Sequence, residues 1–462
     1  MKSFVLEPTP ENILETFMTD LLGRRQDIAY FVSLLNLLEQ GTSIALDARW
    51  GAGKTFFVKQ AKLVLDVFNE HTTICNEEEG KQIKDAWSKL KGCPKPELQP
   101  QVTVYYDAWA NDNDEDPLLS LIYTILQNVS IDYSFKESPA FFTLAAGIAE
   151  VFSGIGFSSI LQTLKQEDPL STLRAKKDLY AEINNFLSSL LAERRNRLVI
   201  FIDELDRCRP SFAVQLLERI KHYFCNEQVT FVFSVNLSEL QHSVKQIYGA
   251  EFDACRYLDR FFDYRLDLPP ADMSRFYHTI ELNDGSWTYD SVCRAVIEVN
   301  KFSLRETARF WAQARAAAYK PTHERSDQFL FGDGRARQFA LYCVLPIMLG
   351  LKIADQARYI QFIEGKDSGP LHDVMAANEG TPYLLRQLLS NNEVFTSSGS
   401  QSQATEVSIH DKLEQLYDAL FVRKYAAPIY EVEIGTCSFS SETRDFLLRS
   451  ASTFSRYADY TL

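Results

Sequence analysis

The sequence predicts an α/β protein in which residues 1–270 form a parallel sheet with covering helices and residues 271–462 are mostly helical. Apolar, strand-like runs alternate with helical segments as far as residue 236, which is typical of a parallel sheet. A glycine-rich turn joins the first of these runs directly to a helix. After "LDLPPADM" (266–273) the pattern becomes mostly helical.

The chain begins its regular pattern with a helix, followed by a strand, a loop and a second helix. Apolar residues near helical spacing predict the first helix over 20–40. The short run "TSIALDA" (42–48) predicts a buried strand, and "TFFVKQAKLVLDVFN" (55–69) predicts an amphipathic helix. The turn "GAGK" therefore connects the end of a strand to the start of a helix.

Later apolar runs predict further strands of the same sheet. These strands span 101–110, 197–207 and 229–236. A helix is expected from Leu118, after the acidic loop "NDNDEDP", and another over 211–224. Two insertions, about 70–100 and about 130–195, interrupt the predicted core.

The second insertion contains an apolar segment of about 25 residues, 140–164. The strands before and after it belong to one sheet, so any membrane crossings must be even in number, and two spans need about 20 residues each. Glu150 near its middle would add about 2.5 to 3.5 kcal/mol to insertion. We therefore expect no integral membrane span, but a helical hairpin broken at "SGIG" and covered by protein. Peripheral membrane contact is the alternative.

Two other segments differ from their surroundings. "FALYCVLPIML" (339–349) is apolar but too short for a span, and it predicts a core helix. "TSSGSQSQATE" (396–406) has low complexity and predicts a flexible loop.

The composition excludes several classes of protein. With 462 residues, 46% hydrophobic and 24% charged, the chain can bury a large core, which we expect to divide into two or three domains, and it is not disordered. A formal net charge of -14 disfavours a broad nucleic-acid surface. The eight cysteines form no C-x-x-C pair, which favours reduced thiols over zinc or disulfides. The first residues lack the apolar core of a signal peptide, so we expect a cytoplasmic protein.

The glycine-rich turn has the features of a phosphate cradle. Backbone N–H groups from Ala48 to Thr55 can surround a phosphate at the start of the following helix, whose dipole favours an anion. Lys54 would neutralise phosphate charge and the Thr55 hydroxyl would bind Mg²⁺. Ala48 stands where such cradles usually have glycine. It requires only a negative φ, so the cradle is expected to form if Gly51 and Gly53 are the residues that approach the phosphate.

Two adjacent carboxylates, Asp203 and Glu204, follow the apolar part of the strand predicted over 197–207. In "VIFIDELDR", Asp203 follows four apolar residues and is expected at the carboxyl end of a buried strand, where it would organise Mg²⁺. Glu204 would orient or deprotonate an attacking water. The alternative is that Glu204, Asp206 and Arg207 cap the next helix. Together, the cradle and these carboxylates predict a nucleotide site.

These motifs resemble the KAP P-loop NTPases, a branch of the STAND and AAA+-like ATPases. The segments that carry the resemblance are "RWGAGKT" (49–55), "YYDAWAND" (105–112), "FIDELDRCRP" (201–210), "RYLDRFFDYRLDLP" (256–269) and "FSLRETARF" (302–310). Their order and spacing agree over roughly residues 20 to 310. The resemblance implies a P-loop NTPase core of the AAA+/STAND-like type with a helical C-terminal lid and extension.

The chain departs from the family pattern at three positions, Ala48, Glu204 and Asn236. Glu204 replaces a common second aspartate, and its longer carboxylate is suited to reach a catalytic water. Asn236 stands where an acid often ends the sensor strand, and it can hydrogen-bond that water or the γ-phosphate. The alternative for Asn236 is a simple helix cap in "NLSEL".

The resemblance also suggests roles for two arginines. Arg260 matches a basic residue that is a candidate finger for the γ-phosphate of a neighbouring subunit, with Arg256 as its rival. Arg305 is similar to the sensor arginine of the helical lid. For Arg260 and Arg305 the alternative is a solvated surface charge.

The resemblance places "DLLGRR" (20–25) against adenine. Leu22 and Gly23 of this segment are therefore expected near the base. Together with the glycine-rich turn, the residues expected to contact the nucleotide are Leu22, Gly23, Arg49, Trp50, Gly51, Ala52, Gly53, Lys54, Thr55 and Phe56. Asp107 and Trp109 belong to the second matching segment, but such a tryptophan more often lies in the core.

The resemblance implies a Mg²⁺-dependent ATPase whose hydrolysis drives a conformational or assembly switch. It further implies a homo-oligomer with Arg260 acting in trans, and a protein effector encoded nearby, as in bacterial defence against phage. Two alternatives stay open. One is a nucleotide-gated scaffold that binds ATP and scarcely hydrolyses it, and the other is a nucleic-acid-stimulated motor, which the acidic composition disfavours.

Overall fold

The structure is a computed structural model, and its described residues form two compact units. One unit is Glu7–Asp272 and the other is built mainly from Met273–Leu462. The described residues are 6–38, 40–69, 77–90, 98–114, 116–128, 197–224, 227–282, 288–323, 335–382, 402–435 and 437–452, with Asn185, Leu191 and Leu385. The predicted hairpin at 140–164 lies outside them.

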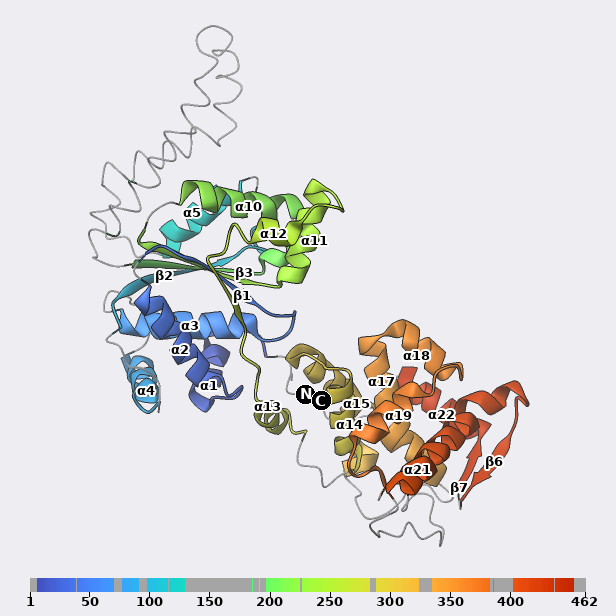
Figure 1. Cartoon of the computed structure of the whole chain (residues 1–462). Coiled ribbons are helices and arrows are strands. Elements are labelled where there is room, and N and C mark those ends of the chain that lie inside the picture. Colours follow the sequence, from blue (N-terminus) through green and yellow to red (C-terminus); the bar gives the residue numbers. More distant parts are fainter. Residues whose placement is uncertain are drawn as a thin grey trace. The chain divides into compact units, whose positions relative to one another are not determined.

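A parallel sheet of five strands is the centre of the first unit (Figure 1). Its strands are β1 (Ser43–Asp47), β2 (Gln101–Asp107), β3 (Arg197–Asp203), β4 (Val229–Val235) and β5 (Tyr264–Asp267). They are arranged in the order β2-β3-β4-β1-β5. Strands β3 and β4 are almost entirely buried, which explains their nearly continuous apolar sequences. The predicted parallel α/β core is confirmed.

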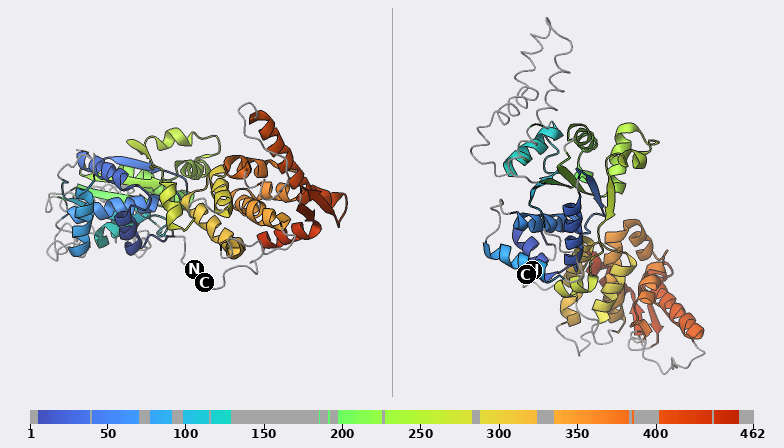
Figure 2. Two further views of the ribbon diagram at one scale, coloured as in Figure 1. Left: turned by 90° about the horizontal axis from the view of Figure 1, so that it is seen from below. Right: turned by 60° about the vertical axis from the view of Figure 1, so that its left-hand side comes forward.

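Helices cover both faces of this sheet, as Figures 1 and 2 show. One face packs against α1 (Pro10–Thr19), α2 (Arg25–Leu37), α3 (Lys54–Phe68) and α4 (Glu77–Ser88). The other packs against α5 (Pro117–Asn128), α10 (Pro210–Tyr223), α11 (Leu237–Tyr248) and α12 (Ala254–Leu258). Two apolar clusters, one on each face, fix the strands and therefore the loops that follow them.

The strand register brings polar residues together at the carboxyl edge of the sheet. Asp107 at the end of β2 lies opposite Asp203 at the end of β3. Asp47 at the end of β1 lies opposite Val235 on one side and Asp267 on the other. Because all the strands are parallel, the loops that carry the predicted site emerge at this edge.

The second unit is mainly helical. Its helices are α13 (Met273–Thr279), α14 (Thr288–Val299), α15 (Leu304–His323), α16 (Arg335–Phe339), α17 (Leu345–Ala354), α18 (Gln356–Ile363), α19 (Gly369–Ala377), α21 (Ser402–Tyr417) and α22 (Ser441–Ser452). A capping box starts α15, because the Ser303 N–H donates to the Glu306 carboxylate at 2.8 Å and the Glu306 N–H reaches the Ser303 hydroxyl at 3.4 Å.

One continuous helical stretch of this unit, Arg335–Ala354, is long and apolar enough to cross a membrane by length and composition. It is also 78% buried inside the protein over its most apolar part. It contains the segment 339–349, so the prediction of a core helix there is confirmed.

The structure corrects three sequence predictions about elements. The edge strand β5 was not predicted, because its side chains are mostly exposed and lack an apolar run. An antiparallel pair, β6 (Glu431–Ile434) and β7 (Cys437–Ser440), adds a hairpin to the region predicted as helical. Helix α21 begins at Ser402, so the end of the loop predicted over 396–406 is helical.

Candidate functional site

The loop between β1 and α3 is a tight turn that depends on two glycines. Gly51 has φ +77° and Gly53 has φ +91°, in the left-handed region that favours glycine. Ala48 is not among the described residues with positive φ, and its N–H extends the sheet by donating to the Val235 carbonyl at 3.2 Å. Alanine therefore fits the first position of the loop without backbone strain.

Lys54 is the first residue of α3 and is only 8% exposed. Its ammonium donates to the Ala48 carbonyl at 2.5 Å and to the Arg49 carbonyl at 3.4 Å, so it lies inside the loop. Burial lowers the pKa of Lys54, while nearby Asp206 and Asp203 oppose this effect. The result is a buried cation at a helix N-terminus, an arrangement suited to a phosphate. Thr55 and Phe56 follow in the first turn of the same helix.

Asp203 ends β3 as an almost fully buried carboxylate, 1% exposed. One oxygen, Oδ2, accepts from the Tyr105 hydroxyl at 2.9 Å, and Oδ1 accepts from the Glu204 N–H at 3.0 Å. Burial and the nearby Asp203 carboxylate raise the pKa of Tyr105, so this phenol stays a neutral donor. Tyr105 was not singled out from the sequence, although it lies within the segment "YYDAWAND".

Glu204 follows in a strained backbone conformation, with φ +61°. Such a conformation costs a residue other than glycine about 1 to 2 kcal/mol. Burial raises the pKa of Glu204 to about 7, Asp203 adds to the increase, and Arg207 opposes it. A carboxylate with this pKa is suited to accept a proton near neutral pH.

Asp206 and Arg207 do not cap the next helix, which was the alternative for them. Helix α10 begins with Pro210, and its N-cap residue Arg209 makes no side-chain cap. Asp206 instead accepts from the Trp50 indole N–H at 2.5 Å, and Arg207 Nε lies 2.5 Å from Glu204 Oε2. The loop after β1 and the loop after β3 are thus joined by side chains.

The expectation that Trp109 lies in the core is wrong. Its side chain is 53% exposed, and its ring faces the Arg207 guanidinium at 5.5 Å. Asp107 closes the turn that presents this ring, because its Oδ1 accepts from the Ala110 N–H at 2.9 Å. A cation partner allows the tryptophan to remain at the surface.

The turn before α2 lies beside the glycine-rich loop. Arg24 donates through Nη1 to the Ala52 carbonyl at 2.9 Å, although it is buried. Burial lowers the pKa of Arg24 to about 10, with Asp27 opposing, so it keeps its charge at neutral pH. The Leu22 carbonyl accepts from the Asp272 N–H, and Gly23 has φ +67°. Leu22 and Gly23 directly precede Arg24, which contacts the glycine-rich loop and was not singled out from the sequence.

Asn236 follows β4 and caps α11, because its side-chain oxygen accepts from the Ser238 N–H at 3.2 Å. The cap uses the amide oxygen, so a role toward a nucleotide would use the amide nitrogen. Asp47 stabilises the same turn by accepting from the Leu237 N–H at 2.9 Å.

The three distal arginines lie away from this cluster or in the other unit. Arg256 is on α12 and Arg260 is in the turn after it, and both are exposed. That turn leads to Asp263, which binds the Ser43 N–H at the amino end of β1. Arg260 therefore lies near the edge of the sheet opposite Lys54. Arg305 is an exposed residue at the start of α15, in the second unit.

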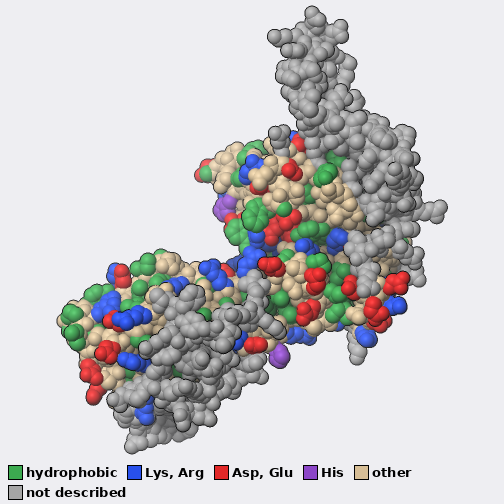
Figure 3. Space-filling view, turned by 180° about the vertical axis from the view of Figure 1, so that it is seen from behind, with side chains coloured by type: hydrophobic (Ala, Val, Ile, Leu, Met, Phe, Trp, Pro, Cys, Tyr) green, Lys and Arg blue, Asp and Glu red, His purple; other side chains and the backbone are tan. Residues whose placement is uncertain are grey.

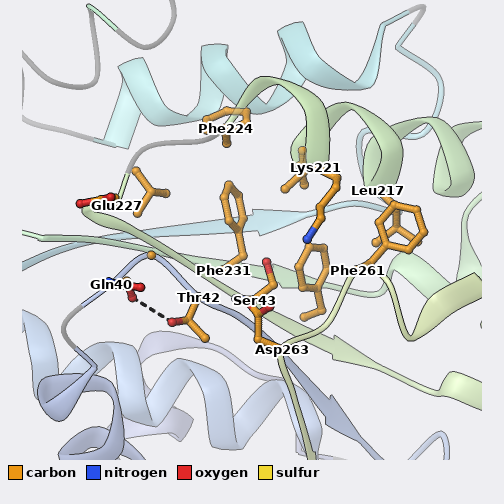
Figure 4. A pocket seen from close by; sticks show the side chains of 14 residues that line it. Gln40, Thr42, Ser43, Leu217, Lys221, Phe224, Glu227, Phe231, Phe261 and Asp263 are labelled. Carbon is orange, nitrogen blue, oxygen red and sulfur yellow. Dashed lines mark hydrogen bonds between the residues drawn. The ribbon is translucent and has the colours of Figure 1, made fainter.

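A cavity of about 280 Å³ also lies at the amino-terminal edge, where Ser43 begins β1 and Val229 begins β4. Figure 4 shows aromatic side chains, including Phe231 and Phe261, with Lys221 nearby. The cavity is separate from the glycine-rich loop, which follows the opposite ends of the strands.

Among curated proteins, none matches this sequence. A solved structure of the Aeropyrum pernix ORC1 protein in complex with DNA is 14% identical and covers 94% of this chain and 91% of its own, at a TM-score of 0.29. A TM-score this low supports no conclusion about this chain. The model of the KAP family P-loop domain matches residues 26–292, more than half of the chain. The match includes the glycine-rich loop and the carboxylates that end β3, and so this chain belongs to the KAP family of P-loop NTPases, with a nucleotide-binding core in its first unit.

Proposed function

We propose that the protein is a Mg²⁺-dependent ATPase that works as a conformational or assembly switch. The observation that carries the proposal is the placement of buried Lys54 beside Asp203 and Glu204 at the carboxyl edge of the sheet. Lys54 supplies positive charge for phosphate, and Glu204 has a pKa suited to take a proton from water. We choose ATP over GTP as the nucleotide by analogy with the family.

The residues at this edge fit a magnesium ion. Mg²⁺ prefers oxygen ligands, and the Thr55 hydroxyl and the Asp203 carboxylate supply them. Tyr105 fixes the orientation of that carboxylate by donating to Oδ2. When bound, Mg²⁺ would neutralise charge on the phosphates and orient them.

The side chains have separate tasks in the proposed reaction. Backbone N–H groups around Gly51 and Gly53 hold the phosphates, and Lys54 neutralises them. Glu204 removes the proton from the attacking water, and Asn236 helps to orient that water through its amide nitrogen. Leu22 and Gly23 provide one side of the adenine site. For Arg305, which belongs to the second unit, the role of a sensor arginine rests on the family resemblance.

We further propose an oligomer in the cytoplasm, with Arg260 completing the site of a neighbouring subunit. The turn of Arg260 lies near the amino-terminal edge of the sheet, and strands of five to seven residues separate that edge from Lys54 by about 15 to 20 Å. A partner effector, and a role in defence against phage, follow from the family resemblance alone. Native mass spectrometry with the products of neighbouring genes tests for the effector.

The experiment that tests the activity is steady-state phosphate release by the purified full chain. We expect release from ATP with Mg²⁺, its loss when EDTA removes the metal, and its return with excess Mg²⁺. The Glu204→Gln variant provides the matched background. If the wild type binds ATP but releases phosphate no faster than the Glu204→Gln variant, the protein is a nucleotide-gated scaffold instead.

The same assay with added DNA or RNA addresses the motor alternative. On the face drawn in Figure 3, Lys and Arg side chains are mixed with Asp and Glu side chains, and the chain carries a net charge of -14. We therefore expect no stimulation by nucleic acid. A strong, salt-sensitive increase in turnover would support the motor instead.

Ala48→Gly tests whether the unusual first residue of the loop weakens the site. Ala48 does not have a positive φ, so glycine would relieve no backbone strain there. The affinity for ATP is therefore expected to change by less than about tenfold, or about 1.4 kcal/mol. Isothermal titration calorimetry with both proteins measures the difference. A much larger gain in affinity would mean that alanine impairs the natural site.

A further inference from the structure

Glu204 is paired with an arginine from its own turn. Residues Leu205–Arg207 form a short 3-10 helix directly after Glu204. The Arg207 N–H donates to the Glu204 carbonyl at 3.1 Å, and this closed turn brings Arg207 Nε to 2.5 Å from Glu204 Oε2. Both side chains are largely buried, at 21% and 18% exposed, so solvent screens the pair less than a surface ion pair. One carboxylate oxygen is occupied, and Oε1 is the oxygen suited to meet a water.

Arg207 is itself held by two tryptophans from other loops. Its guanidinium carbon lies 6.0 Å from the Trp50 ring centroid and 5.5 Å from the Trp109 ring centroid. Guanidinium groups favour aromatic faces, where the positive charge meets the negative face of the ring. Arg207 thus receives its orientation from the loop after β1 and from the loop after β2.

Both tryptophans are fixed by further contacts. Trp50 donates its indole N–H to the buried carboxylate of Asp206 at 2.5 Å. The loop of Trp109 is attached to the start of α10, because Asp112 accepts from the Arg209 N–H at 3.1 Å and pairs with its guanidinium. The two rings therefore have defined positions even though both are partly exposed.

We propose that Arg207 is a positioning residue that holds the Glu204 carboxylate in the orientation needed for turnover, and that Trp50 and Trp109 hold Arg207. This inference rests on the proposed ATPase function. Trp50 belongs to the glycine-rich loop, so a shift of that loop is transmitted to Arg207 and then to Glu204. The loop that binds phosphate and the base that activates water are coupled through one guanidinium.

Substitutions at Arg207 and Trp109 test this in the full chain. Arg207→Gln is expected to lower kcat about 10- to 100-fold while KM and the Kd for ATP stay within about twofold, because a misplaced group slows the reaction without removing a phosphate contact. Arg207→Lys should recover part of the loss, since it keeps the charge. Trp109→Phe keeps an aromatic face and should resemble the wild type, whereas Trp109→Leu should resemble Arg207→Gln.

A double variant separates positioning from general structural damage. In a Glu204→Gln background, Arg207→Gln should cause no further fall in kcat, because both act on one step. Arg219→Gln is the control, since it breaks the ion pair with Asp116 on the same helix layer without touching Glu204. We expect it to lower the melting temperature, but its kcat should match the wild type at a temperature where the variant is folded.

Four outcomes would overturn the proposal. They are an unchanged kcat in Arg207→Gln, a parallel loss of ATP binding, a further fall in the double variant, and equal effects of Trp109→Phe and Trp109→Leu. If the wild type releases no phosphate, the ATPase function fails and this inference fails with it. If the wild type is active and Arg207→Gln equals it, the inference alone fails.

Discussion

Lys54→Ala should abolish ATP binding, whereas Glu204→Gln should bind ATP and lose turnover. The alanine variant removes the buried ammonium that lies inside the loop, and we expect Kd to rise at least about 100-fold, or about 2.8 kcal/mol. The glutamine variant leaves the loop intact but cannot accept a proton, and general bases contribute about 10² to 10⁴ in rate. Calorimetry and phosphate release measure the two effects.

The control for this pair is Lys62→Ala. Lys62 is on the same helix and pairs with Asp66 at 2.6 Å, away from the loop, so ATP binding should be unchanged. If Lys54→Ala and Glu204→Gln retained ATP equally, the assignment of this loop as the phosphate site would be wrong.

Arg260→Ala should lower turnover by a factor on the order of 10³ with little loss of ATP binding. Its turn lies near the opposite edge of the sheet from Lys54, so it is proposed to act on the site of a neighbouring subunit. The active unit is then an oligomer. Arg256→Ala is the matched variant, because Arg256 is exposed one turn earlier and should have a smaller effect.

Mixing two inactive variants decides between action in trans and in cis. A Glu204→Gln subunit still offers Arg260, and an Arg260→Ala subunit still offers an intact Glu204. Mixed oligomers should therefore recover part of the activity if subunits exchange. No recovery in oligomers verified as mixed would place Arg260 in cis or make it structural, and a fully active monomer would remove the trans mechanism.

The strands of the core could be predicted where burial imposes a continuous apolar sequence. β3 and β4 are covered on both faces and consist mostly of apolar residues, so their positions were predicted, although β3 ends at Asp203 rather than at residue 207. β5 is an edge strand with mostly exposed side chains. It forms a strand because it pairs with β1, and no apolar run marks it in the sequence. The strands β6 and β7 escaped prediction because each has only four residues, too few to establish an alternating pattern.

The site could be predicted where its residues are close in sequence. Gly51, Gly53 and Lys54 have a spacing that follows from the loop itself. The pair Trp50–Asp206 joins residues far apart along the chain, so no local pattern reveals it. Trp109 was placed in the core by hydrophobicity alone, because its partner Arg207 lies in another loop.

The position of β1 in the sheet has a consequence for protein synthesis. β1 is the first strand along the chain but pairs with the two last strands of the sheet, β4 and β5, so the strand that carries the phosphate loop finds its partners only late in translation. Pairing of strands distant in sequence is slow, and until it occurs the apolar strand is exposed. A ribosome-bound chain therefore cannot pair both edges of β1 before residue Asp267 has left the exit tunnel.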